Sequence, residues 1–420
     1  MRWRPAFRAV ALSAALCAAV LSPAGPAPAA PQAVTTEAVF NNPVGTAAEQ
    51  QAVVRRQVEL VDGAPAGSRV RLAMYYADDP TLSDALIAAH ARGGRVQAIF
   101  DHKAVSMAPY QSPLAALGSD TAKTSWVHEC GAGRGCVGTR TLGTVDAINH
   151  NKFLLLSQTQ GTPNVVVQSS ANLHNGRDGT KGWNNALVLT GNDKIYAAYD
   201  AYFDDLAAGK ANNNYYDTGR APVTSGAAKA HFYPRAESNG KPYDDASEDT
   251  VATVLDHVQC FGNTKYGTTD NHRTRIRVSM TIFSRPYLAQ RLVALDAAGC
   301  YVEVSETYNP SSALEKQSLQ YLLAKTSSAY NGVITKYYCQ ADPVWIHDKY
   351  LLVEGNYYDG PDRKIVWTGS HNWSGNSLRQ SDETMLQLED DAVHDAYVAN
   401  FNELRAATTH QPANGAAIAC

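Results

Sequence analysis

The chain has 420 residues, which is more than one ordinary domain and predicts two or three. Apolar residues make up 45% and charged residues 18%, a balance that allows a sizeable core and excludes a disordered chain. A content of 30 Gly and 19 Pro excludes a coiled coil. The formal net charge of −4 disfavours a dedicated nucleic-acid binder, which usually carries a basic excess.

Residues 1–29 have the pattern of a secretory signal peptide. Arg2, Arg4 and Arg8 precede an apolar run at residues 9–21, which is too short to span a bilayer comfortably. Ala27-Pro28-Ala29 matches an A-x-A cleavage site, so we expect a mature chain that starts near Ala30. Cys17 lacks the upstream leucine of a lipoprotein signal, and no later segment approaches transmembrane length. The sequence therefore predicts a secreted, soluble, extracellular protein.

The cysteines agree with export. Six remain after the signal peptide, and an even number in an exported chain predicts disulfides, with 15 possible pairings. Only Cys130 and Cys136, which flank a glycine-rich turn, have a local argument for pairing. Zinc is the competing interpretation, but the chain has no C-x-x-C pattern, so we expect no metal site.

The chain contains two copies of one pattern, at residues 69–100 and 275–306. The copies align without a gap, and the matched pairs include Arg69 with Arg275, Met74 with Met280, and Gly93 with Gly299. Each copy begins as an alternating apolar strand, continues as a helix that ends at a glycine, and closes with a second strand. Such a unit is a βαβ crossover with a parallel strand pair. Any two βαβ units look partly alike, but the gapless identities favour a duplication.

This repeat predicts an α/β protein with two similar lobes, because a solenoid would have a shorter period. We assign residues 30–215 to the N-terminal lobe and 216–420 to the C-terminal lobe, with the join inside 212–227. Each lobe is expected to open with a helix, at residues 47–60 and 246–258.

A second matched pair of segments carries polar residues. In the first copy, His150 and Lys152 begin one apolar stretch, and Ser170 and Asn172 end the next. The second copy repeats this order with His347, Lys349, Ser370 and Asn372. Side chains alternate along a strand, so each His shares a face with its Lys, and each Ser with its Asn.

Two lobes that face each other across a pseudo-twofold axis would bring both sets together. Two lysines and two asparagine amides suit an anion with several oxygens, such as a phosphate. Two histidines on opposite sides suit in-line displacement, in which one attacks and the other protonates the leaving group. A lone H-x-K is usually an exposed strand edge, but the ordered duplication favours a catalytic site.

These motifs resemble the phospholipase D superfamily, whose signature is H-x-K-x-x-x-x-D followed by G-S-x-N, twice in one chain. The resemblance covers essentially the whole mature chain, and its size and leader are similar to those of secreted bacterial phospholipases D. It implies two α/β/α sandwich lobes with mixed sheets and an active site at their interface. It also implies a phosphohistidine intermediate and no requirement for a metal or other cofactor.

The chain departs from this signature at three positions. The signature aspartate is Ser157 in the first copy and Glu354 in the second, and the first glycine of G-S-x-N is Ser169. The fifth residue after the lysine falls on the strand face opposite His and Lys, so we expect it to support the strand. These departures leave a non-catalytic homologue as an alternative.

The leading hypothesis is a secreted phosphodiesterase that hydrolyses phospholipid headgroups, or transfers them to an alcohol, at a membrane or micelle surface. We expect a monomer with no stable nucleic-acid partner. A nuclease of the same superfamily is the alternative enzyme, but acidic net charge disfavours tracking of nucleic-acid phosphates. In either case Lys152, Lys349, Asn172 and Asn372 would hold phosphate oxygens, with Ser170 and Ser370 beside them.

The two histidines are expected to differ in role. An alignment of the strand after each motif pairs Glu383 with Asn185. A carboxylate commonly orients a catalytic histidine, and in the resembled family it comes from the opposite lobe. Carried over, Glu383 would orient His150 as the nucleophile and leave His347 as the general acid. Glu383 as a surface strand residue, with Asp178 or Asp382 in the orienting role, is the alternative.

Overall fold

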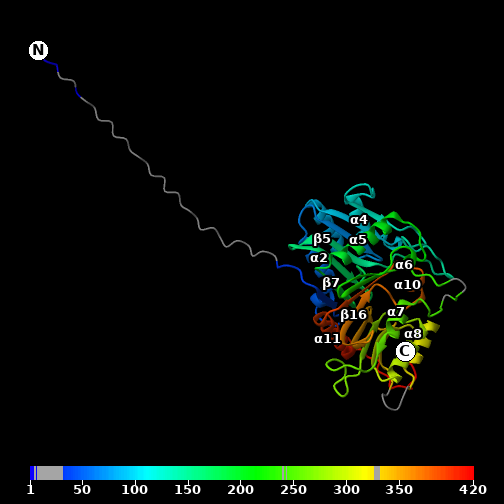
Figure 1. Cartoon of the computed structure of the whole chain (residues 1–420). Helices are drawn as coiled ribbons and strands as arrows, with labels where there is room; N and C mark the ends of the chain where they lie inside the picture. Colours follow the sequence, from blue (N-terminus) through cyan, green and yellow to red (C-terminus); the bar gives the residue numbers. More distant parts are fainter. Residues whose placement is uncertain (4–5, 7–31, 239–240, 243, 326–331) are drawn as a thin grey trace.

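The structure is a computed structural model that describes residues 1–3, 6, 32–238, 241–242, 244–325 and 332–420. The expected signal peptide and its cleavage site lie outside these residues. Figure 1 shows two lobes, one with α2, α4 and α5 and the other with α7, α8 and α11. Among the described helices, none combines the length and the hydropathy needed to cross a membrane.

The first lobe is built on one mixed sheet with the strand order β1-β7-β6-β5-β2-β3-β4. Its strands are β1 (Glu37–Asn41), β2 (Arg69–Met74), β3 (Arg95–Phe100), β4 (Trp126–Glu129), β5 (Lys152–Thr159), β6 (Thr162–Ser169) and β7 (Gly182–Leu189). The β2–β3–β4 segment is parallel and the remaining pairs along this order are antiparallel. The predicted βαβ unit is therefore confirmed as β2, α3 and β3.

The second lobe repeats this sheet, with the order β13-β12-β11-β15-β16-β17-β9-β8. Its strands are β8 (Val223–Ser225), β9 (Ala228–Phe232), β10 (Val258–Gln259), β11 (Arg275–Met280), β12 (Tyr301–Tyr308), β13 (Ile334–Cys339), β15 (Lys349–Tyr357), β16 (Gly360–Gly369) and β17 (Thr384–Glu389). Read from the opposite end, β9-β17-β16-β15-β11-β12-β13 matches the first sheet strand for strand. The two lobes are similar α/β units, as predicted.

Helices cover the sheets in corresponding positions. They are α1 (Ala47–Gln50), α2 (Ala52–Asp62), α3 (Thr81–Ala91), α4 (Ala108–Leu117), α5 (Asp193–Ala208) and α6 (Tyr215–Thr218) in the first half of the chain. The second half has α7 (Thr250–Asp256), α8 (Pro286–Ala297), α9 (Ala313–Leu322), α10 (Gly375–Arg379) and α11 (Asp391–Ala407). The 3-10 turn η1 (His102–Ala104) lies between β3 and α4.

Both opening helices differ from their predicted extents. The first is split at Gln51 into α1 and α2, because Gln51 leaves the helical conformation (ψ 10°). The second begins only after Asp249, whose carboxylate accepts hydrogen bonds from the backbone N–H groups of Val251 and Ala252 and so caps the helix. It ends before Val258, which begins β10.

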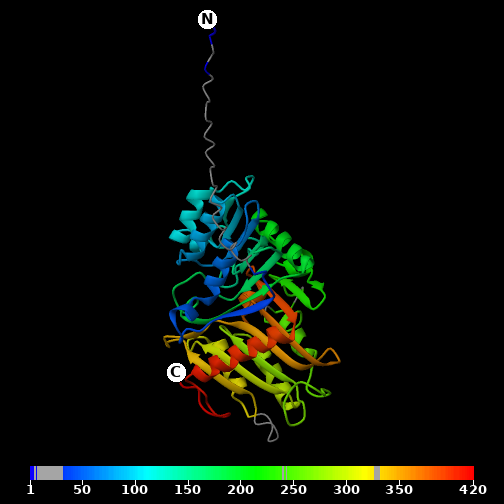
Figure 2. The same cartoon turned by 90° about the vertical axis from the view of Figure 1, so that its left-hand side faces the viewer.

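The lobes share a core. α5 packs on strands of both sheets, and α11 contacts β1 of the first lobe as well as β15 and β16 of the second. Figure 2 shows α11, in red, lying across the orange strands of the second sheet. One hydrophobic cluster joins Phe153 and Tyr202 to Phe232 and Tyr397. The interface is thus as apolar as a domain interior, which fixes the two motif sets relative to each other.

All six cysteines expected in the mature chain are paired as disulfides: Cys130–Cys136, Cys260–Cys300 and Cys339–Cys420. The predicted local pair is confirmed. In the described part of the chain, the groups of side chains close enough to share a metal ion both include these disulfide cysteines. Their thiolates are therefore not available as ligands.

Candidate active site

The two motif sets lie at equivalent edges of the two sheets. Lys152 is the first residue of β5 and Lys349 the first of β15, while β6 and β16 end one residue before Ser170 and Ser370. The histidines and asparagines therefore lie just outside the strands that the sequence assigned to them. Because β5 pairs with β6 and β15 with β16, each His–Lys pair lies beside its own Ser–Asn pair.

Each histidine is held by the backbone of the opposite lobe. The N–H of His150 donates to the carbonyl of Asp382 (2.9 Å), and the N–H of His347 donates to the carbonyl of Trp183 (2.8 Å). These cross-lobe bonds explain why the histidines leave their own strands. They also make the site depend on both lobes, since neither histidine is positioned by its own lobe alone.

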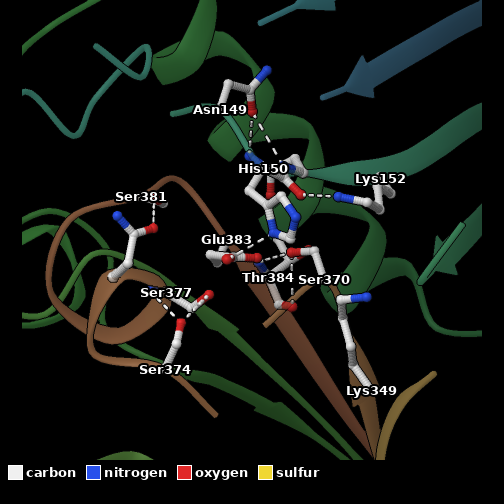
Figure 3. A network of polar contacts seen from close by, with 12 residues as sticks. Asn149, His150, Lys152, Lys349, Ser370, Ser374, Ser377, Ser381, Glu383 and Thr384 are labelled. Carbon is white, nitrogen blue, oxygen red and sulfur yellow. Dashed lines mark hydrogen bonds and ion pairs between the residues drawn. The ribbon is translucent and has the colours of Figure 1, made fainter. Parts of the chain in front are cut away.

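The ring of His150 contacts the carboxylate of Glu383. Its Nδ1 lies 2.8 Å from Oε1, and Glu383 is fully buried, so it is not a surface residue. Figure 3 shows the carboxylate below the ring, with Lys152 and Lys349 to the right. Burial tends to raise the pKa of Glu383, but the neighbouring His150 holds that pKa below its ordinary value. The carboxylate is therefore ionised and fixes the Nδ1–H tautomer of His150, which leaves Nε2 free for substrate.

The other two carboxylates considered for this role are already engaged. Asp382 accepts from the backbone N–H groups of the loop 136–138, at 2.6 Å for Gly138. Asp178 accepts from Nδ2 of Asn172 (2.9 Å) and pairs with the ring of His174. Neither of these two carboxylates contacts the ring of His150, so the geometry assigns that ring to Glu383.

The ring of His347 has an amide where His150 has a carboxylate. Its Nδ1 lies 2.9 Å from Oδ1 of Asn184, not of Asn185. The predicted pairing of Glu383 with Asn185 is wrong by one residue: Ser170 bonds to the carbonyl of Asn185 as Ser370 bonds to that of Thr384, so Glu383 corresponds to Asn184. Matching the leucines at 187 and 189 with those at 386 and 388 would have found it.

Both lysines are buried below the site. Lys152 Nζ donates to the carbonyl of His150 (2.8 Å), and Lys349 Nζ donates to the carbonyl of His347 (2.8 Å) and to Oγ1 of Thr281 (3.0 Å). Burial lowers the pKa of Lys152 to about 7, and burial together with Lys152 holds the pKa of Lys349 well below its ordinary value. A bound anion would reverse this effect, because it favours the charged ammonium.

The histidines are neutral for the same reason. Burial lowers the pKa of His150 to about 4, although Glu383 opposes the effect. Burial and the nearby Lys349 hold the pKa of His347 well below its ordinary value. A neutral imidazole with a free Nε2 is the form that can act as a nucleophile.

The asparagines line a cavity of about 460 Å³ together with both histidines and Glu383. Oδ1 of Asn172 and Oδ1 of Asn372 are buried without a hydrogen-bond partner among the described residues. Because an amide oxygen only accepts, a phosphate held by these residues would have to be bound by their Nδ2 groups. Other residues from both lobes complete the wall: Tyr75, Asp178, Thr281, Thr307, Asn309, Glu315, Trp345 and Ser374. Sequence reasoning identified none of these except Asp178, because no periodic pattern marks them.

The motif serines form hydrogen bonds with residues next to the cavity. Ser170 donates to Oδ1 of Asn184 (2.8 Å), and Ser370 accepts from the backbone N–H of Thr384 (3.0 Å). Neither is among the residues that line the cavity. Direct contact between these serines and a substrate stays a prediction. In the structure Ser170 contacts the partner of His347, whereas Ser370 contacts the residue after Glu383.

The two residues at the signature aspartate positions support their strands, as expected. Ser157 Oγ accepts from the backbone N–H of Arg69 (2.8 Å). Glu354 pairs with Arg277 (3.2 Å) and accepts from the N–H of Gly267. Both lie away from the cavity, so these departures leave its chemistry intact.

Comparison with known proteins agrees with this geometry. The sequence profile of the family described as cardiolipin synthase, PLD-like domain, matches the chain twice, at residues 64–207 and 269–405. The chain belongs to the phospholipase D superfamily. No curated protein sequence matches it. This phospholipase D-like protein carries both halves of the duplicated domain in one chain.

Solved structures share the fold at low sequence identity. Phosphatidylserine synthase of Haemophilus influenzae Rd KW20 is 11% identical with a TM-score of 0.58, over 89% of this chain and 87% of that one. Polyphosphate kinase of Porphyromonas gingivalis is 12% identical with a TM-score of 0.51, over 88% of this chain. The protein spans only 50% of that kinase. Nuc of Salmonella typhimurium, a phospholipase D family member, is 16% identical with a TM-score of 0.30, over 42% of this chain and 95% of that one.

Proposed function

We propose that the protein is a secreted phosphodiesterase that cleaves phospholipid headgroups through a phosphohistidine intermediate. The observation that carries the proposal is that one His–Asn pair from each lobe lines the same cavity, with the lysine of each motif buried against its histidine. Nε2 of His150 would attack phosphorus and the bond to the headgroup oxygen would break. His347 would give that oxygen a proton, which it takes up when the bound phosphate anion raises its pKa. Water, or an alcohol other than the headgroup, would then attack the phosphatidyl group on His150, and His347 would accept the proton of the attacking hydroxyl.

Charge in the cavity favours a lipid over a polynucleotide. Its described lining includes three carboxyl groups, from Asp178, Glu315 and Glu383, and no arginine. Burial raises the pKa of Glu315 to about 7, so Asp178 and Glu383 carry most of the negative charge. A polynucleotide would place its neighbouring phosphates along these walls, where the carboxylates repel them. The described walls also lack arginine side chains that could take the place of the counterions bound to those phosphates. A phospholipid brings a single phosphate to the lysines and so avoids this repulsion.

Other observations support export of the protein and transfer to an alcohol. Three disulfides are typical of proteins that fold in oxidising compartments, which agrees with a secreted protein. The names of the matched family and of the structurally similar phosphatidylserine synthase both denote synthesis. We therefore include transfer to an alcohol, beside hydrolysis, in the proposal.

The test compares three substrates with the purified mature protein and a His150→Ala control. Phosphatidylcholine vesicles should release choline and phosphatidic acid, and added ethanol should divert product to phosphatidylethanol. Cleavage of single-stranded DNA without lipid cleavage would indicate a nuclease. Binding of phosphate analogues, with no turnover of lipid, DNA or a chromogenic phosphodiester, would indicate a non-catalytic homologue.

A further inference from the structure

A second cavity adjoins the catalytic one on the second lobe. It has a volume of about 510 Å³ and lies between the start of α8, one face of α9, and α10. We call it the α8–α9 groove, and its apolar wall consists of Pro286, Tyr287, Leu314, Tyr321 and Leu378. Leu314 is 53% exposed, an unusual state for a large apolar side chain in this protein.

The groove opens next to the phosphate site. Ser374 and Asn376 line both cavities, so α10 and its N-cap form their common edge. Ser374 follows Asn372 by two residues, which places their Cα atoms within about 7 Å of each other. Figure 3 shows Ser374 and Ser377 on the turn of chain beside Glu383. A ligand whose phosphate is held at Asn372 would therefore lie next to the edge that the two cavities share.

The wall of the groove is rigid on the α8 side. The hydroxyl of Tyr287 donates to Oδ2 of Asp249 (2.6 Å), and Asp249 also forms a buried ion pair with Arg285. These contacts satisfy the polar end of Tyr287 inside the lobe, which leaves its ring as groove wall. An apolar surface held in place in this way is suited to an apolar ligand, since binding does not have to order it.

The cavity beside the first-lobe motif is much smaller. After Asn172 the chain continues with His174, whose ring pairs with Asp178 and with Asp78 (3.1 Å). The cavity lined by Asn172 and His174 measures only about 10 Å³. Of these two cavities, only the α8–α9 groove is therefore large enough to hold a chain of methylenes.

We propose that the α8–α9 groove binds an acyl chain of the phospholipid while its phosphate occupies the catalytic cavity. This inference rests on the proposed function. The acyl chains stay with the phosphatidyl group on His150, so their binding is retained in the transition state and raises kcat/KM. Each methylene buried in the groove should raise kcat/KM roughly fourfold until the groove is full.

The test uses monomeric phosphatidylcholines of increasing chain length, from dibutyroyl to diheptanoyl, below their critical micelle concentrations. Two variants alter the groove at exposed positions: Leu314→Ser removes apolar wall, and Gln290→Trp fills the space. Val44→Ser is the matched control, because Val44 is similarly exposed (58%) and lines neither cavity. p-Nitrophenyl phosphorylcholine, which has no acyl chain, reports the catalytic site alone.

We expect kcat/KM to rise with chain length in the native protein and in Val44→Ser, and to become nearly flat in both groove variants. Rates on p-nitrophenyl phosphorylcholine should stay within about twofold in all four proteins, since the catalytic residues are unaltered. Native chain-length dependence in both groove variants would overturn the acyl site while leaving the proposed function intact. Cleavage of the chromogenic diester without cleavage of any phosphatidylcholine would overturn both.

Discussion

Nδ1 of His347 lies 2.9 Å from the amide oxygen of Asn184, at the place where His150 has the carboxylate of Glu383 at 2.8 Å. The orientation of this amide is fixed, because its Nδ2 donates to the carbonyl of Gly179 (2.8 Å). Both rings therefore carry a proton on Nδ1, but only His150 has a charged partner. The carboxylate of Glu383 stabilises the positive charge that His150 acquires when its Nε2 bonds to phosphorus. The neutral amide of Asn184 gives no such stabilisation, so a protonated His347 is the stronger acid. This asymmetry supports the proposal that His150 attacks phosphorus and that His347 donates the proton.

This assignment predicts different kinetics for the two histidine variants. p-Nitrophenolate leaves without a proton, so a general acid is dispensable for the first step on phosphatidyl-p-nitrophenol, in which p-nitrophenol takes the place of the headgroup. His347→Asn should release a burst of about one equivalent of p-nitrophenol per enzyme and then stall, because the base for the second step is missing. His150→Asn should show no burst. Rapid acid quench and mass spectrometry should find the phosphoryl group on His150, and its recovery on His347 would reverse the roles.

Exchange of the two histidine partners tests the carboxylate itself. Glu383→Gln should lower kcat by about 10²–10⁴, because the positive phosphohistidine loses its counter-charge. Asn184→Asp should instead raise the pKa of His347, measured by ¹⁵N NMR, since it adds a negative charge beside that ring. The double variant Glu383→Gln/Asn184→Asp should stay as slow as Glu383→Gln. Recovery of native turnover in the double variant would show that either ring can serve as the nucleophile.

The lysines should matter mainly in the transition state. Removal of one charge-assisted donor to the phosphate oxygens typically costs about 10²–10³ in turnover. We expect this loss for Lys349→Met, with a smaller change in the affinity for substrate, because negative charge on these oxygens is bound most tightly as the reaction proceeds. Thr281→Val, which removes the hydroxyl that contacts Lys349 and the carbonyl of Asp348, keeps the ammonium and so separates loss of its charge from loss of its positioning. Unchanged kcat in Lys349→Met would remove this lysine from the mechanism.

The sequence predicts the fold and most of the site because both are duplicated. Each H-x-K and S-x-N pair follows a strand boundary, and the period of a strand fixes which side chains share a face. Glu383 and its counterpart were harder to place, because a slip of one residue in aligning two strands exchanges Asn184 for Asn185 and moves the side chain to the other face. The cross-strand register, with Ser170 bonded to the carbonyl of Asn185, fixes that choice and agrees with the leucine pattern of the two strands.

The rest of the cavity wall, beyond the motif residues, Asp178 and Glu383, could not be predicted from the sequence. Trp345 reaches the cavity because β14 (Trp345–Ile346) leaves its own sheet and pairs with β7 of the first lobe. Glu315 reaches the cavity from α9, where it is buried. No pattern in the sequence around Glu315 indicates that it is buried or that it lines a site. Such residues are brought together by the packing of lobes whose motifs are far apart in the chain, and no local pattern encodes that packing.

Catalysis should not depend on a divalent metal. Positive charge at the phosphate site comes from Lys152 and Lys349, which take the part that Mg²⁺ has in many phosphoryl-transfer enzymes. Activity should therefore be unchanged after dialysis against EDTA and after treatment with 1,10-phenanthroline. A loss that one divalent ion restores, and that others do not, would contradict this prediction.

Anion binding should be coupled to proton uptake. Burial lowers the pKa of Lys152 to about 7, so most of this lysine is neutral at pH 8 in the free protein and charged at pH 6. Tungstate, a phosphate analogue, favours the charged ammonium and raises its pKa, so the complex takes up a proton at pH 8 that the free protein already holds at pH 6. Calorimetry in buffers of different ionisation enthalpy should thus give a larger uptake at pH 8 than at pH 6. Lys152→Met should lose the difference between the two pH values while Ser157→Ala, which alters the same strand on its opposite face, keeps it. The same pH difference in Lys152→Met as in the native protein would mean that another group, such as Lys349, accounts for the uptake.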